Sequence, residues 1–309
     1  MWCFGGLAVL VPYAGGIAER SGASVGEAAA PAAIVHELPQ DPPQDPARAD
    51  PAAAAKLAVV EALRADGVEL DLEAGVASVE VSVLTRFQAL EYLLVGPRGQ
   101  GHESLFGTEA LPSSLNVALL SLGVEQGRNL RRVEEDGGGL ETGGGGEREQ
   151  RAASEAWRDR NVRVAPPDGQ PVYLHAGWRV GDEVYFYRVE DLIADVQNGR
   201  AMPRQGFVYL GSKLLELVEG EPPVFAADHF NNLVNLALFQ EGHTLLTSRL
   251  RAAVADDIWF PNTWLLPVEG QLARLVIADR PLAFPPASVL ELLPQAQLPE
   301  EESPAREGE

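Results

Sequence analysis

Apolar and polar residues alternate along two neighbouring segments of this chain, and this alternation constrains the fold more strongly than any other feature. Along residues 68–72, valine and leucine alternate with glutamate and aspartate, and along residues 78–83, valine alternates with serine and glutamate. Successive side chains of a strand point to opposite faces, so each segment is typical of a strand with one buried face. Residues 73–75 between them supply a glycine-containing turn, so the two segments predict a hairpin.

Further strands are predicted where short apolar runs end at turn-forming residues. They cover residues 90–95, 103–106, 172–180, 183–189, 207–210, 224–227, 233–239, 244–247, 264–266 and 273–278. Helix-forming residues predict helices at 52–65 and 112–122, and a glycine stands just beyond each. Because helices are few and do not alternate with strands, we expect a strand-rich α+β fold, with a mainly antiparallel sheet and two or three short helices.

The first residues predict a signal peptide that covers residues 1–18. The run from Trp2 to Ala18 is apolar, but it is short for a membrane span and Pro12 interrupts it. A buried first strand and a single anchor helix are the alternatives. Residues 19–51 are rich in proline and alanine and predict an extended tether. We therefore expect an exported protein, periplasmic, envelope-associated or secreted, with no stable membrane span in its mature form.

Two further breaks define the limits of the expected domain. Residues 136–147 contain seven glycines and predict a flexible loop. Residues 284–309 are acidic and rich in proline, and they predict a tail with too few apolar side chains to offset the entropy of ordering. The domain would thus consist of a first half at 52–135 and a second half at 148–283.

Charge and cysteine content exclude several classes of function. The chain has 45 acidic and 24 basic residues and a formal net charge of −21. Without a basic block, it is poorly suited to bind nucleic acid or an anionic membrane surface. Its single cysteine, Cys3, allows neither an intramolecular disulfide nor a cysteine-ligated iron–sulfur cluster. We accordingly predict no cofactor and no nucleic-acid partner.

A series of short motifs resembles the YdjY domain family. The motifs are Leu-Glu-Tyr at 90–92, Gly-His-Glu-Ser at 101–104, and the segments 112–123, 172–178, 188–193, 206–212 and 227–228. The resemblance covers about residues 68–281 and implies a bacterial, often exported domain without an established activity. Some members of that family are described as ferredoxin-like, which the cysteine content rules out here. The chain also departs from the expected pattern at Asn116, in place of a histidine, and at Asn231 and Asn232, in place of a glycine.

The segment His102-Glu103-Ser104 is the most chemically suggestive cluster in the chain. We expect Glu91 on a neighbouring strand that pairs with this segment as a hairpin. A histidine oriented by a carboxylate can act as a general base or a metal ligand. Alternation along a strand would place His102 and Ser104 on one face and Glu103 on the other. A Ser104–His102–Glu91 arrangement and a purely structural hairpin both stay open.

A metal site would need ligands from distant parts of the chain. The five histidines do not show the spacing of a helical zinc motif. The candidate ligands are His102, Asp228 and His229, with Glu103 beside the first of them. The sequence favours an exported binding or structural module of the cell envelope. The alternative is a hydrolase or metal-dependent enzyme with His102, Glu103 and Glu91 as its catalytic candidates.

Overall fold

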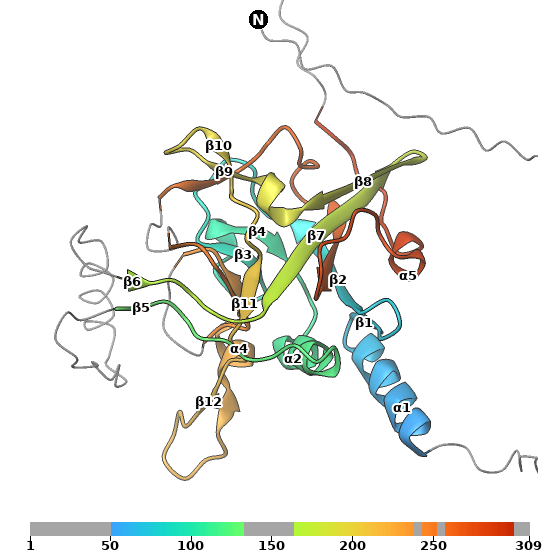
Figure 1. Ribbon diagram of the computed structural model, residues 1–309, viewed down its shortest axis with the longest axis vertical. Coiled ribbons are helices and arrows are strands. Elements are labelled where there is room, and N and C mark those ends of the chain that lie inside the picture. The colour runs from blue at the N-terminus through green and yellow to red at the C-terminus, as the bar shows by residue number, and fades with distance from the viewer. Residues whose placement is uncertain (1–50, 133–163, 238–242, 252–256, 300–309) are drawn as a thin grey trace, which may run out of the picture. The chain divides into compact units, whose positions relative to one another are not determined.

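The computed structural model shows a strand-rich fold with four short α-helices among the described residues (Figure 1). It describes residues 51–132, 164–237, 243–251 and 257–299. The predicted signal peptide, tether and glycine-rich loop therefore lie outside the described residues, apart from Pro51 at the end of the tether.

Ten strands form the main sheet, and eight of them close it into a barrel. The ten strands are β1 (Val68–Asp71), β2 (Val76–Val83), β3 (Tyr92–Val95), β4 (Ser104–Gly107), β7 (Pro171–Val180), β8 (Glu183–Arg188), β11 (Phe207–Tyr209), β14 (Asn232–Asn235), β15 (Leu246–Ser248) and β17 (Leu272–Ala278). The cyclic order is β2-β17-β7-β11-β15-β14-β3-β4, and β4 pairs with β2 to complete the ring. The pairs β3–β4 and β14–β15 are parallel, and the other pairs of the sheet are antiparallel.

Helices and smaller sheets surround this barrel. The helical segments are α1 (Pro51–Ala65), α2 (Pro112–Ser121), α4 (Ala226–Phe230), α5 (Ala287–Leu290) and the short 3₁₀ helices η1 (Gly101–Glu103) and η2 (Val189–Leu192). The smaller sheets consist of β5 (Arg131–Arg132) with β6 (Val164–Ala165), β12 (Leu214–Leu215) with β13 (Val224–Phe225), and β9 (Ile193–Asp195) between β10 (Arg200–Ala201) and β16 (Trp259–Pro261). The helices predicted at 52–65 and 112–122 are confirmed as α1 and α2.

The barrel interior is the main hydrophobic core, and the alternation seen in the sequence determines which side chains fill it. Val79 and Val81 of β2 are buried in this core, whereas Glu80 between them is exposed. Val79 is paired with Val68 of β1, so the predicted hairpin is confirmed with its expected buried face. Trp178 of β7 is fully buried in the same core. Each such large side chain contributes roughly 1.5–3 kcal/mol relative to an exposed position.

The C-terminal described segment packs on the outside of the barrel, contrary to the predicted tail. Val289 of α5 and Leu293 join a second buried cluster with side chains of β2 and β17. The backbone of Arg179 in β7 accepts a hydrogen bond from the N–H of Ala296 at 2.8 Å and donates one to the carbonyl of Pro294 at 2.8 Å. Apolar side chains three to four residues apart order residues 284–299, which are rich in proline but contain one acidic residue, Glu291. The acidic end of the predicted tail, residues 300–309, lies outside the described residues.

The connection between β3 and β4 differs from the predicted hairpin. The two strands are parallel, with Tyr92 paired with Ser104. Parallel neighbours normally need a crossover of about a dozen or more residues, but residues 96–103 make this one. The loop is tight because Gly99 packs against backbone: a Cβ at that position would lie 2.5 Å from the carbonyl oxygen of Asn231. A short loop between two apolar runs favours a hairpin in sequence-based reasoning, which explains the error.

The strand predicted at 264–266 is also wrong. The strand in this region is β16, and it ends at Pro261. The N–H of Leu265 donates to the carbonyl of Asn262 at 3.1 Å, so the chain turns immediately after the strand. Trp264 lies in this turn with 91% of its surface exposed. The apolar character of the segment misled the prediction, because an exposed tryptophan and a buried one look alike in a sequence.

Candidate functional site

The structure places His102, Glu103 and Ser104 of the Ser104–His102–Glu91 arrangement, which the sequence left open, in different settings. His102 and Glu103 belong to η1 rather than to a strand, and His102 Nε2 lies 3.5 Å from Glu103 Oε1. The His102 side chain is 72% exposed. Ser104 is fully buried at the start of β4, and its hydroxyl donates a hydrogen bond to the carbonyl of Gln100 at 2.6 Å. The histidine therefore faces the neighbouring carboxylate, while a backbone oxygen holds the serine hydroxyl.

Glu91 takes part in the contacts that join three segments of the barrel. Its N–H donates to the carbonyl of Glu103 at 2.9 Å, and its own carbonyl accepts from the N–H groups of Leu236 at 2.8 Å and Ala237 at 3.0 Å. Burial raises the pKa of the adjacent Tyr92, and the negative charges of Glu91 and Glu103 raise it further. These contacts give Glu91 a structural role between β3, η1 and the end of β14.

Asp228, a metal candidate from the sequence, caps a helix. Its Oδ1 accepts a hydrogen bond from the N–H of Ser113 in the first turn of α2 at 2.8 Å. The residue at the N-cap position of α2, Leu111, offers no side-chain acceptor, and Pro112 has no N–H to satisfy. A carboxylate at a helix N-terminus also interacts favourably with the helix dipole. Asp228 thereby joins α4 to α2.

The remaining metal candidates are not gathered around a common point. The rings of His229 and Phe230 form a T-shaped pair with a centroid distance of 4.9 Å, and Phe230 stacks on His243 at 4.3 Å. Burial and nearby positive charges lower the pKa of His243. Within the four described ranges, no group of three or more histidine, cysteine, aspartate or glutamate side chains could hold a metal ion. His102 and Asp228 thus have separate partners.

The three asparagines at which the chain departs from the expected family pattern have structural contacts. Asn116 in α2 accepts a hydrogen bond from the Tyr209 hydroxyl at 2.5 Å. Asn231 adopts a left-handed conformation with φ of 57°, which glycine and asparagine tolerate best. Asn232 Oδ1 accepts the N–H of Gln100 at 3.2 Å, within the tight loop between β3 and β4.

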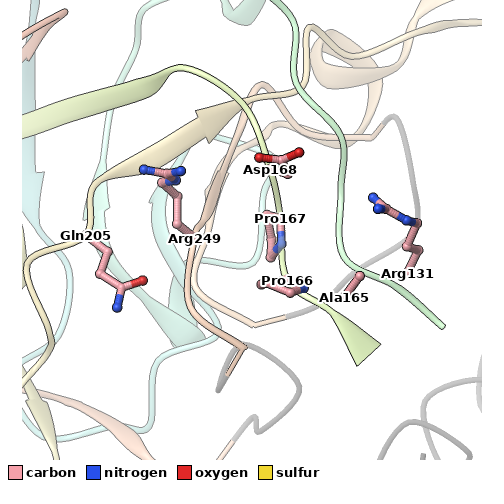
Figure 2. Close-up of a pocket in the computed structure, with 7 residues that line it drawn as sticks. All are labelled: Arg131, Ala165, Pro166, Pro167, Asp168, Gln205 and Arg249. Atoms are coloured by element: carbon pink, nitrogen blue, oxygen red, sulfur yellow. The ribbon is translucent and has the colours of Figure 1, made fainter. Parts of the chain in front are cut away.

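A pocket of about 460 Å³ lies beside the β5–β6 pair (Figure 2). Its lining residues are Arg131, Ala165, Pro166, Pro167, Asp168, Gln205 and Arg249. They come from β5, from β6 and the turn that follows it, from the loop before β11, and from the residue directly after β15. The volume falls within the range of about 300–1,000 Å³ that is typical of ligand sites.

Close backbone packing holds the proline-containing wall of this pocket in place. Arg128 and Asp168 pair through two backbone hydrogen bonds of 2.7 and 3.0 Å. Gly127 and Gly169 flank this bridge and pack over Val208, on the outer face of β11. A Cβ on Gly127 would lie 2.4 Å from Val208 Cγ1, so this approach requires glycine. The wall is therefore fixed against the barrel.

The pocket is locally basic although the chain is strongly acidic. The Arg128 guanidinium lies 3.2 Å from Asp168 Oδ2 and offsets the one carboxylate of the lining. Among the described residues, no salt bridge involves Arg131 or Arg249. Figure 2 shows Arg249 and Gln205 on one side of the two prolines and Arg131 on the other. Two guanidinium groups and one amide thus surround an apolar wall.

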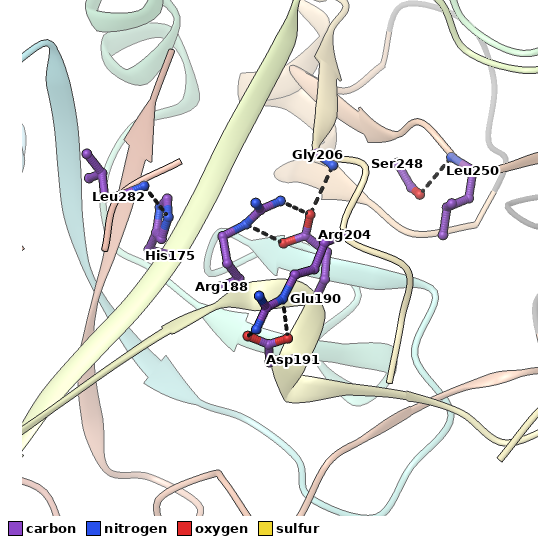
Figure 3. A network of polar contacts seen from close by, with 9 residues as sticks. All are labelled: His175, Arg188, Glu190, Asp191, Arg204, Gly206, Ser248, Leu250 and Leu282. Carbon is purple, nitrogen blue, oxygen red and sulfur yellow. Dashed lines mark hydrogen bonds and ion pairs between the residues drawn. The ribbon is translucent and has the colours of Figure 1, made fainter. Parts of the chain in front are cut away.

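A buried ion pair supports the loop that carries Gln205 (Figure 3). Glu190 is completely buried and accepts hydrogen bonds from both the Nε and an Nη of Arg188. Its Oε1 also accepts the N–H of Gly206 at 2.9 Å. The carbonyl of Gly206 in turn accepts the N–H of Arg249 at 3.4 Å. One buried carboxylate therefore orders the backbone beside two lining residues.

Sequence reasoning missed this pocket, because its residues come from separate segments and match no motif. The one available signal was the segment 127–132, in which three of six residues are arginines.

Comparison with protein-family models, curated proteins and solved structures gives no match to the chain. In the part of the chain that the structure describes, no helix is long and apolar enough to cross a membrane.

Proposed function

We propose that this protein is a binding module whose pocket takes a small organic anion bearing a carboxylate or phosphate group. The observation that supports this proposal is the convergence of Arg131, Arg249 and Gln205 on one pocket, in a chain whose formal net charge is −21. The chain has 24 basic residues against 45 acidic ones, and these two arginines have no carboxylate partner among the described residues, so a negative ligand would be stabilised between them.

The chemistry of the lining suggests how the ligand would be held. A planar guanidinium group can donate two parallel hydrogen bonds to a carboxylate or phosphate, and the Gln205 amide can donate or accept beside it. Pro166 and Pro167 offer a rigid apolar wall for the carbon skeleton of the ligand. Asp168, which is neutralised by Arg128, can orient a hydroxyl or amino group of the same ligand.

We also propose that the module is an exported, YdjY-like protein of the cell envelope. The apolar residues 2–18 and the order of the motifs between residues 68 and 281 support this part of the proposal. The contacts of Ser104 and Asp228 favour a binding role over the hydrolase or metal-dependent enzyme, because a carbonyl holds the serine hydroxyl and the aspartate caps α2.

Titration calorimetry with succinate, citrate and inorganic phosphate tests the proposed anion site. The neutral diamide of succinate and a diamine of equal length serve as ligand controls. Arg249→Gln should weaken binding by about tenfold or more, because a charge-assisted hydrogen bond contributes about 1.5–3 kcal/mol. Arg64→Gln removes an exposed ion pair between the last turn of α1 and Glu69 of β1, and it should leave the affinity unchanged. The proposal fails if no anion binds, or if both variants weaken binding equally.

A further inference from the structure

The β12–β13 ribbon, residues 213–225, carries apolar side chains that the described part of the chain leaves uncovered. Figure 1 shows β12 and the loop after it extending beyond α4, away from the barrel. Four of its side chains are among the exposed large hydrophobic groups: Leu214 at 64%, Leu217 at 49%, Val218 at 59% and Val224 at 36%. Single exposed apolar residues are ordinary on protein surfaces, but a group of them on one short element indicates an interaction site.

The ribbon is held by its base and its tip rather than by a core of its own. At the base, the N–H of Ala226 donates to the carbonyl of Lys213 at 2.8 Å. At the tip, the N–H of Glu221 donates to the carbonyl of Val218 at 3.1 Å. Isolated two-stranded ribbons are marginally stable in water. The anchoring to α4 therefore presents the exposed side chains in a defined arrangement.

The charges on the ribbon indicate what kind of partner it fits. Glu216, Glu219 and Glu221 lie between the two strands in sequence, and Lys213 at the base is the one basic residue of the ribbon. A second copy of this chain would bring the same glutamates and a further formal charge of −21. An anionic membrane surface would be repelled in the same way. A cationic partner is the complementary choice.

The backbone of the ribbon offers a way to bind such a partner. β12 and β13 pair only with each other among the described strands, so each has an outer edge with free backbone groups. An extended peptide can add a strand to such an edge through main-chain hydrogen bonds. We propose that the ribbon docks an extended segment of another protein in which apolar residues alternate with lysine or arginine.

Fluorescence anisotropy with the full chain and two labelled peptides tests this proposal. One peptide alternates leucine with lysine, and the other alternates leucine with glutamate. The lysine peptide should bind, and the double variant Leu217→Ser with Val218→Ser should weaken its binding by at least about tenfold. Leu57→Ser changes an equally exposed leucine on α1 and should leave the affinity unchanged. Thermal unfolding of each variant verifies that the fold is intact.

Charge variants and association assays cover the alternatives. Glu216→Gln with Glu219→Gln should weaken binding of the lysine peptide. Asp182→Asn with Glu183→Gln removes the same number of charges at the exposed start of β8 and should leave that binding unchanged. Equal binding by all variants would mean non-specific attraction to an acidic chain and would overturn the proposal. Binding of neither peptide would also overturn it. If the chain sediments as a dimer and only the ribbon variants lose the dimer, the surface binds a second copy of the chain instead. If the chain binds phosphatidylcholine vesicles and only the ribbon variants lose this binding, the surface binds lipid instead.

Discussion

Replacing His175 with glutamine should remove a large part of the acid sensitivity of the fold. His175 lies on the outer face of β7, fully buried, and its ring stacks on Phe186 at 5.1 Å. Its Nε2 accepts the N–H of Leu282 at 3.1 Å (Figure 3), so the neutral ring carries its proton on Nδ1. Burial, together with the charge of Arg188, lowers the pKa of His175 from 6.5 to about 4, although Asp191 opposes the shift.

The lowered pKa determines the sign and size of the effect. Between about pH 6.5 and 4, the unfolded chain binds a proton at His175 that the folded chain does not bind. The free energy of unfolding therefore decreases as the pH falls through this range. With about 1.36 kcal/mol per pKa unit, the loss is about 2 kcal/mol at about pH 5 and about 3 kcal/mol at about pH 4. Below that pH, the folded chain is protonated as well and this loss stops growing.

Urea unfolding of the wild type and His175→Gln at about pH 7.5 and about pH 5 measures this contribution. Glutamine retains an oxygen that can accept the N–H of Leu282, and it does not titrate. Between about pH 7.5 and about pH 5, the free energy of unfolding should fall by about 2 kcal/mol more in the wild type than in the variant. His102→Gln, at an exposed histidine, should follow the wild type. Identical pH profiles for wild type and His175→Gln would refute the reasoning, because other titrating groups are common to both chains.

Two further substitutions test the packing around the site candidates that the sequence indicated. Gly99→Ala should destabilise the domain by about 1–3 kcal/mol in urea unfolding, because the new Cβ would lie 2.5 Å from the Asn231 carbonyl. Gly101→Ala, where the nearest atom is 3.7 Å away, should cost much less, and equal losses would contradict the reasoning. Asp228→Ala should lower the free energy of unfolding by about 1 kcal/mol, because the cap on α2 is lost. Asp228→Asn should retain most of this stabilisation, because an amide oxygen can also accept the N–H of Ser113. Equal stability of Asp228→Ala and wild type would mean that the cap contributes nothing.

Much of the fold could be predicted because its signals are local. The alternation around Val79 and Val81 identifies the inward face of β2 within a few residues of sequence. The closure of the barrel leaves no such signal. Val83 of β2 pairs with Phe106 of β4 to complete the ring, and the alternation in each strand is equally compatible with many other neighbours. The parallel pairing of β3 and β4 was likewise hidden, since the close approach of Gly99 to Asn231 exists only in the folded chain.

The candidate site could hardly be predicted at all. His102 and Glu103 attracted attention because histidine and carboxylates often carry chemistry, yet they lie on an exposed 3₁₀ turn. Arg131 and Arg249 lie in separate segments, and an arginine is more often a solvated surface residue than part of a site. Only the folded backbone brings them together around Pro166. Residue type alone therefore favours His102 and Glu103 over the arginines that line the pocket.

The position of β17 has a consequence for the order in which the chain can fold as it is synthesised. This strand lies between β2 and β7, and pairs with both. A growing chain in which β17 is still inside the ribosome therefore holds β2 and β7 without their common neighbour, and the ring stays open. Such distant pairing slows folding, since a long loop must be closed before the contacts form. The barrel can therefore close only when β17, the last of the described strands, has emerged.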